Sequence, residues 1–495
     1  MNILSRPAFF EAFQKRLASK EQTPVPGVFG RWLASSLLRR SPGRARRPSK
    51  TSDLPNLALE ALEPRYLLSA DILPFAVDMN DLAGADYSLR YDNLIQAIQI
   101  YDNKSDTLID QRNVQQIDYI VVRGTDADDK LTIDFGENFL AALDVRFDGG
   151  AGNDTLAMTG GSFDAVRLAT DTGLSGSITA QAGALTHSIG LANVGAVEDD
   201  TTASQRIYAD TSGQARVIRI GSSDDSNDGL SVLDAGTFNN LIAYKFATPA
   251  VSLTVDAGAG DDSFVLREID PALAGRVVLS GGAGSDAVVG PPRDTDWHLT
   301  GEGSGDVAGV SFVTVENLIG SAGNEDTFFV GAAGRLSGVM AGGDAGFDSM
   351  VLDGGTFASV KYAATGQTSG TITRDGVVLR YDGLEPIIDN SVVADRVITT
   401  SNADDEATLT DNGATLTLSS DSLISTFESI TFNKPSTSLT INLGDDLGIP
   451  ILSKDTLTIN AVNLGSTALI INGQDGKDEV TISGTLTAGA VTVNA

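Results

Sequence analysis

The sequence predicts an all-β protein, an elongated parallel β-helix or β-roll-like solenoid, with a basic and mostly disordered segment at its N-terminus. Three observations favour this fold. Short clusters of Gly, Asp, Ser and Asn recur along the chain, and each leads into a run of alternating apolar and polar residues. Such clusters are tight turns, and such runs are short, half-buried strands. The composition agrees, because 53 Gly, only 15 Pro and 6% aromatic residues suit many short strands.

The length and the charge distribution narrow the possibilities further. A chain of 495 residues is too long for one compact domain unless that domain is elongated. Residues 1–50 carry a net charge of +9 and the remainder carries −40, which together give −31. An acidic body repels nucleic acid and anionic lipid, so we expect no nucleic-acid partner. It attracts divalent cations, although acidity also keeps a long protein soluble.

The N-terminal region differs from the rest of the chain. Residues 1–58 are basic and lack strand patterns, so we expect them to be largely disordered. No stretch reaches 18 consecutive apolar residues, which predicts no transmembrane segment. The chain has no cysteine, so disulfides and zinc sites built on thiolates are excluded.

The most regular turns follow the pattern G-G-x-G-x-D-x-U-x, in which U is a large apolar residue. Residues 149–157 and 281–289 match it throughout, and residues 257–265 match with Ala for the first Gly. Residues 342–350 and 472–480 are related, with altered loops. Glycine permits positive φ and lets carbonyl oxygens turn towards a shared centre. The Asp adds a carboxylate oxygen, which is a ligand that Ca²⁺ prefers.

These turns are therefore candidate calcium ligands, with neighbouring carbonyl oxygens completing each site. The alternative is a tight Gly-Asp corner between strands, with no ion. The copies are far apart in the sequence, and an isolated copy has too few oxygen ligands for a full site. The candidate residues are Gly149, Gly150, Gly152, Asp154, Gly258, Gly260, Asp262, Gly281, Gly282, Gly284, Asp286, Asp348 and Asp478.

Two resemblances follow from these motifs. The glycine-rich turns resemble the nonapeptide of RTX-type, or hemolysin-type, calcium-binding repeats. Residues 59–71, LEALEPRYLLSAD, resemble the LEPR-XLL N-terminal domain of very large, repetitive bacterial proteins. The matching residues are Leu62, Glu63, Pro64, Arg65, Leu67 and Leu68. This resemblance implies a large exported or surface protein that carries calcium-binding repeats.

An internal repeat organises the body of the chain. Residues 149–179 align with residues 342–373 after one insertion, and residues 251–255 are similar to residues 437–441. The unit is roughly 190 residues long. We therefore expect a LEPR-XLL-like segment at 59–84, a first β-repeat region at 85–340 and a second, truncated one at 341–495. A string of β-sandwich modules would fit the same period.

These features predict a structural, adhesin-like part of an exported bacterial protein, located extracellularly or at the cell surface and stabilised by calcium. A host, surface or matrix polysaccharide or protein is a further candidate partner. We expect no catalytic site, because His187 and His298 lie far apart and outside any catalytic motif. One alternative is a polysaccharide hydrolase or lyase that uses paired acids such as Asp261 and Asp262. Another is a calcium-independent surface-layer or matrix component.

Overall fold

The computed structural model describes residues 73–79, 84–136, 142–222, 230–234, 242–421, 425–444 and 454–494. The chain divides into two units, Met1–Ile72 and Leu73–Ala495. The first unit lies outside the described residues, and so do the expectations of disorder at 1–58 and of the LEPR-XLL motif. The second unit is all-β, as predicted. Its described residues contain strands and the short 3-10 helices η1 (Val114–Gln116) and η3 (Pro271–Leu273), but no α-helix.

The strands form two long sheets, which we call sheet A and sheet B, and the chain passes repeatedly from one to the other. In spatial order sheet A contains β1 (Leu73–Asp78), β5 (Ile117–Arg123), β7 (Asp144–Asp148), β11 (Leu185–Ala192), β10 (Gly176–Ala182), β9 (Ser162–Thr170), β13 (Thr202–Asp210), β17 (Ser252–Asp256), β19 (Val277–Ser280), β23 (Val310–Val313), β22 (Ser304–Val307), β21 (Asp296–Gly301), β25 (Thr327–Gly331), β27 (Ser349–Asp353), β31 (Ile387–Asp389), β35 (Ile430–Asn433), β34 (Thr415–Ser420), β33 (Glu406–Asp411), β37 (Thr456–Asn460) and β39 (Glu479–Ile482).

Sheet B follows the same progression along the chain. In spatial order it contains β4 (Thr107–Asn113), β3 (Ala97–Asp102), β2 (Asp86–Asp92), β6 (Lys130–Asp134), β8 (Thr155–Thr159), β12 (Ala196–Asp199), β16 (Ala243–Ala247), β15 (Leu230–Asp234), β14 (Val217–Ser222), β18 (Ser263–Leu266), β20 (Ala287–Val289), β24 (Asn317–Ile319), β26 (Val339–Ala341), β30 (Val377–Asp382), β29 (Gly370–Arg374), β28 (Thr356–Ala364), β32 (Val392–Thr399), β36 (Ser438–Asn442), β38 (Ala468–Asn472) and β40 (Val491–Asn494).

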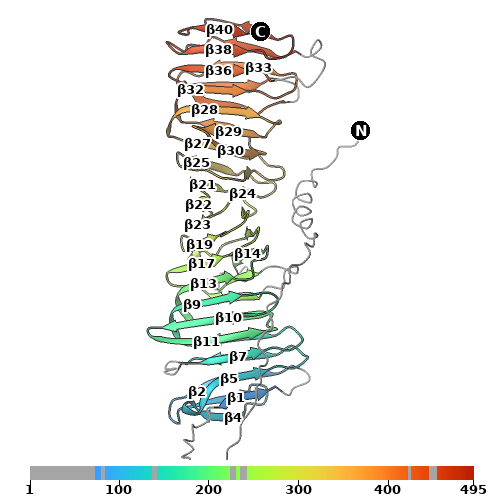
Figure 1. The fold of residues 1–495 in the computed structure, drawn as a ribbon, viewed down its shortest axis with the longest axis vertical. Coiled ribbons are helices and arrows are strands. Elements are labelled where there is room, and N and C mark those ends of the chain that lie inside the picture. Colours follow the sequence, from blue (N-terminus) through green and yellow to red (C-terminus); the bar gives the residue numbers. More distant parts are fainter. Residues whose placement is uncertain are drawn as a thin grey trace, which may run out of the picture. The chain divides into compact units, whose positions relative to one another are not determined.

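A coil is one passage across each sheet with the two corners that join them, and successive coils stack in chain order (Figure 1). Parallel pairing joins each coil to the next. Leu253 of β17 lies opposite Val277 of β19, and Phe264 of β18 lies opposite Val288 of β20. The pairing continues from β24 through β26 to β30, so the two expected repeat regions share one pair of sheets. This β-helix-like stack differs from a string of antiparallel sandwiches.

Antiparallel meanders interrupt the parallel pairing, and they were not predicted. In a meander the chain crosses one sheet three times before it changes sheet. Sheet A contains β9–β10–β11, β21–β22–β23 and β33–β34–β35, and sheet B contains β2–β3–β4, β14–β15–β16 and β28–β29–β30. Equivalent corner residues of adjacent coils are 22 to 25 positions apart in simple coils and 44 to 50 apart where a meander intervenes.

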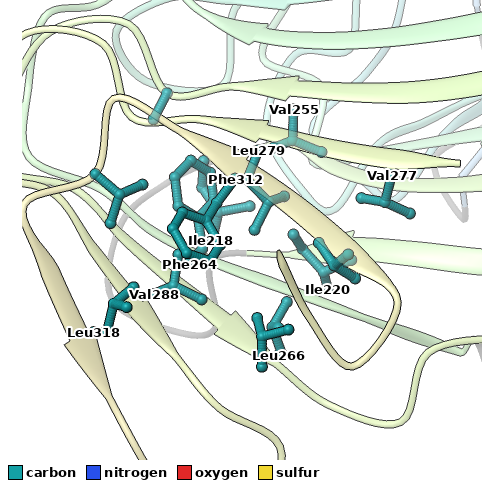
Figure 2. Close-up of a cluster of buried hydrophobic side chains, with 14 of the residues drawn as sticks. Ile218, Ile220, Val255, Phe264, Leu266, Val277, Leu279, Val288, Phe312 and Leu318 are labelled. Carbon is teal, nitrogen blue, oxygen red and sulfur yellow. The ribbon is translucent and has the colours of Figure 1, made fainter. Parts of the chain in front are cut away.

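The hydrophobic core lies between the sheets. Most strands alternate between buried and partly exposed residues, as β17 and β38 do, so each strand presents one apolar row inwards. Figure 2 shows this arrangement in the middle of the stack, where Val255, Leu279 and Phe312 of sheet A pack near Phe264, Val288 and Leu318 of sheet B. Each such buried side chain contributes about 1.5–3 kcal/mol.

Candidate functional site

The glycine-rich turns are the corners of the stack. Residues 149–154, 257–262 and 281–286 join sheet A to sheet B, whereas residues 342–348 and 472–478 join sheet B to sheet A. The candidate calcium ligands therefore lie in two separate rows of corners. Asp154, Asp262 and Asp286 belong to one row, and Asp348 and Asp478 belong to the other.

Corners that are distant in the sequence lie directly on one another. Ala259 pairs with Ala283, and the backbone N–H of Asp262 donates to Oδ1 of Asp286 at 2.8 Å, 24 residues later. We expected motif copies that are far apart in the sequence to be isolated from one another, and this is wrong. The residues between the copies form one full coil, which brings the second corner onto the first. The perfect copy at 149–154 likewise stacks on the corner at 124–129, where Asp129 N–H donates to Asp154 Oδ1 at 2.8 Å.

The recurring geometry of these contacts forms an aspartate ladder. In each step, a carboxylate oxygen accepts a hydrogen bond from a corner N–H of the preceding coil. Such an N–H has no strand carbonyl opposite it, and a buried donor without a partner is costly. The further donor–acceptor pairs are Ala85–Asp129 at 2.5 Å, Arg216–Asp262 at 2.6 Å, Asp326–Asp348 at 2.8 Å, Asp405–Asp455 at 2.6 Å and Asp455–Asp478 at 3.2 Å.

The glycines of the motif make room for this ladder. A Cβ on Gly281 would lie 2.6 Å from Oδ2 of Asp286, so the first glycine lets the carboxylate fold back over the corner. Gly284 has a φ of +144°, and a Cβ there would lie 1.7 Å from the carbonyl oxygen of Gly260 in the coil below. The spacing of the motif thus has a structural reason that holds with or without an ion.

Three of the candidate carboxylates are buried, and among the described residues one oxygen of each has no hydrogen-bond partner. Asp154, Asp262 and Asp286 are at most 2% exposed, and within the described part of the chain the Oδ2 atom of each has no hydrogen-bond partner. Loss of hydration raises the pKa of Asp262 to about 7 and that of Asp286 to about 6. The backbone N–H that donates to each carboxylate lowers its pKa, but this effect is smaller than that of burial. Burial likewise raises the pKa of Asp348 to about 6.

These oxygens bear directly on calcium binding. In the described ranges, no three His, Asp or Glu side chains converge in a group that could hold a metal ion. Ca²⁺ accepts backbone carbonyl oxygens and water as ligands beside carboxylates. The unpartnered Oδ2 atoms of Asp262 and Asp286, in consecutive corners, fit such a mixed ligand set. Asp478 is less enclosed, since it is only partly buried.

Several ladder residues were not among the predicted ligands. They are Asp129, Asp326, Asp405 and Asp455, and each is at most 2% exposed. Their turns lack most of the motif's glycines, so a search for glycine spacing does not find them. The signal that would have found the first three is an Asp at the end of a polar cluster and directly before an alternating apolar run, as in GTDADDKLTI.

Two fully buried ion pairs, each with a tyrosine, are a further polar feature of the core. Arg206 of β13 contacts Asp199 of β12, and both side chains are fully buried. Tyr244 donates to Asp199 Oδ2 at 2.8 Å, and Arg206 also donates to the carbonyl oxygens of Ala247 and Thr201 at 2.8 and 2.5 Å. We call this group the Asp199 triad, after Asp199, Arg206 and Tyr244.

The second group, the Asp389 triad, consists of Asp389, Arg396 and Tyr362. Arg396 donates to Tyr362 Oη at 3.0 Å and to Asp389 Oδ2 at 2.5 Å, and both charged side chains are fully buried. Nothing in the sequence singled out either triad. A buried charge needs its partner to remain in the core, so both triads are structural elements.

The raised pKa values predict that acid stabilises the calcium-free stack. Folding raises the pKa of Asp262 from 3.8 to about 7. Protonation of Asp262 therefore increases the free energy of unfolding, with the full increase below about pH 4, and this increase is lost as the pH rises to about 7. In EGTA, the melting temperature should therefore rise between about pH 7.5 and 5.5. Asp262→Asn, which resembles the protonated acid, should be the more stable protein at the higher pH. An equal difference between variant and wild type at both pH values would contradict this.

Together, the fold and its corners define a β-helix-like repeat protein with an internal aspartate ladder. No family model matches the sequence, and no curated protein shows significant similarity to it. In the described part of the chain, no helix is long and apolar enough to cross a membrane.

Proposed function

We propose that this chain is a structural, adhesin-like part of a large exported bacterial surface protein, and that calcium at the corners stabilises its solenoid. The observation that carries the proposal is the pair of consecutive corners at 257–262 and 281–286. Among the described residues the buried Oδ2 atoms of Asp262 and Asp286 have no hydrogen-bond partner, and the two corners are joined by backbone hydrogen bonds to the carbonyl oxygens of Gly258 and Ala283. The resemblance to LEPR-XLL and RTX-type proteins supports export and an extracellular or cell-surface location.

The continuous stack supports a structural role. Coil after coil pairs along both sheets, and one hydrophobic core runs from Phe75 to Ile471. Such an arrangement makes a spacer whose length increases with the number of coils. In this role the outer faces are available to a host, surface or matrix polysaccharide or protein, which is the partner that we propose.

Calcium would act on this spacer through mass action. Without calcium at neutral pH, each buried carboxylate either stays charged, which destabilises the folded state, or binds a proton. A calcium ion would neutralise these carboxylates and bind ligands from adjacent corners. Because these ligands come together only in the folded state, the ion would stabilise that state and not the unfolded one. The residues that would hold it are Asp154, Asp262, Asp286, Asp348 and Asp478, with carbonyl oxygens of their glycine-rich loops.

Thermal unfolding with and without calcium tests this proposal. At about pH 7.5, millimolar calcium should raise the melting temperature of the purified chain well above its value in EGTA. Asp286→Asn should lose part of this increase, because it keeps the Oδ1 acceptor but removes the charge.

A matched control uses Asp144→Asn, since Asp144 is exposed on β7 and outside the corners. Its response to calcium should equal that of the wild type. If the wild type melts at the same temperature in EGTA and in calcium, the corners bind no ion, and the structural role would have to stand without calcium.

A further inference from the structure

The two copies of the internal repeat lie on exchanged sheets. Residues 149–179 contain β8, β9 and β10, and the aligned residues 342–373 contain β27, β28 and β29. β8 belongs to sheet B and β27 to sheet A, whereas β9 and β10 belong to sheet A and β28 and β29 to sheet B. Each strand of the first copy therefore corresponds to the strand nineteen places later, in the opposite sheet.

Individual residue pairings confirm this correspondence. Arg167 of β9 lies opposite Thr179 of β10 and Ile207 of β13. Its aligned counterpart, Lys361 of β28, lies opposite Thr373 of β29 and Val397 of β32. The same surroundings are thus built twice, once in sheet A and once in sheet B.

The ladder and the ion pairs of the two triads follow the same exchange. The Asp129–Asp154 step lies in a corner from sheet A to sheet B, and the equivalent Asp326–Asp348 step lies in a corner from sheet B to sheet A. Asp199 and Arg206 sit in sheets B and A, respectively. Asp389 and Arg396, each 190 residues later, sit in sheets A and B.

The odd number of strands per copy explains why the exchange occurs. Each copy contains nineteen strands, and each of its three meanders uses three strands for a single passage across a sheet, so the copy makes thirteen passages. Because this number is odd, the next copy begins in the opposite sheet, half a coil further on. The meanders also alternate strictly between the sheets along the stack. Each adds two strands, or about 10 Å, to one sheet, so alternation keeps the two sheets level.

We infer that the repeating unit is related to its successor by a half turn about the stacking direction, so that equivalent surfaces of successive units face opposite sides. A feature on the outer face of sheet A in one unit recurs on the outer face of sheet B in the next. Two units are needed before the same surface faces the same side again. A partner that recognises the unit would accordingly meet its binding surface on both sides of the stack.

Electron microscopy of a doubly labelled chain tests this arrangement. Arg167 and Lys361 are exposed, and the native chain has no cysteine, so Arg167→Cys and Lys361→Cys can be biotinylated selectively and marked with streptavidin. The two streptavidin molecules should lie on opposite sides of the stack in the same particle. Circular dichroism of the labelled chain verifies that the β structure is retained.

The control pair combines Arg167→Cys with Ser311→Cys. Ser311 is exposed on β23, which lies in the same sheet as Arg167, and the substitution is nearly isosteric. These two labels should lie on the same side. If the pair at 167 and 361 also lies on one side, the half-turn relation is wrong, whatever the outcome with calcium.

Discussion

Replacing Asp199 with Ala should destabilise the coils around β12 and β13 by about 3–5 kcal/mol. The substitution leaves the guanidinium of Arg206 fully buried without its negative partner, and it also removes the acceptor of the Tyr244 hydroxyl. Amide hydrogen exchange resolved along the chain is the appropriate measurement, because coils of a repeat stack can open locally. The amides of β12 and β13 should lose protection by several orders of magnitude.

An exposed ion pair provides the control for this prediction. Asp144 lies 4.0 Å from Arg146, and both side chains are at least half exposed. Asp144→Ala should therefore change the stability by only about 0–1 kcal/mol. Asp389→Ala should reproduce the large effect in the second copy. Unchanged protection around β13 in Asp199→Ala would show that the triad contributes little to the stability of the core.

The second large effect is expected at Gly284. Alanine at this position would place its Cβ 1.7 Å from the Gly260 carbonyl oxygen, at a φ of +144°. Backbone strain of this kind costs about 1–3 kcal/mol. The steric overlap adds to it, because the preceding coil cannot move away without breaking the pairing of Ala259 with Ala283. Gly284→Ala should thus raise hydrogen exchange in β18 and β20, the strands that follow the two stacked corners.

A substitution at Gly376 separates backbone strain from steric overlap as causes of the lost stability. The φ of Gly376 is +90°, but a Cβ there would meet no atom of the described residues within 4 Å. Gly376→Ala should therefore show the conformational cost alone, about 1 kcal/mol. Equal losses of stability in the two variants would mean that the close approach of the stacked corners at Gly260 and Gly284 does not restrict which residue can occupy position 284.

Local patterns predicted much of the fold, because they report on local structure. The alternation in residues 252–256 and 263–266 gives the strands β17 and β18, and the intervening glycines give the corner. The sequence also indicated that these glycine and aspartate residues act together. It did not reveal that the corners at 257–262 and 281–286 stack, since the length of a coil depends on how many strands the chain makes before it turns.

The features that the sequence did not predict depend on pairing between strands that are far apart in the chain. A meander strand such as β10 has the same alternation as a coil strand, so nothing local distinguishes antiparallel from parallel neighbours. The exchange of sheets between the copies follows from the odd number of strands per copy, which the local patterns did not reveal either. Asp199 and Arg206 are separated by six residues across a corner, and a charged pair at this spacing is usually exposed.

The stacking direction also determines how this unit responds to force. The strands run across the stack, so the hydrogen bonds between coils point along it, and β1 and β40 belong to opposite ends. Tension applied along the stack loads the hydrogen bonds between successive coils in series, so coils separate one at a time. Each 24-residue coil that peels away would release roughly 80 Å of extended chain. The unit would therefore yield in steps under load, as an extensible tether does, and recover its length as the coils re-form.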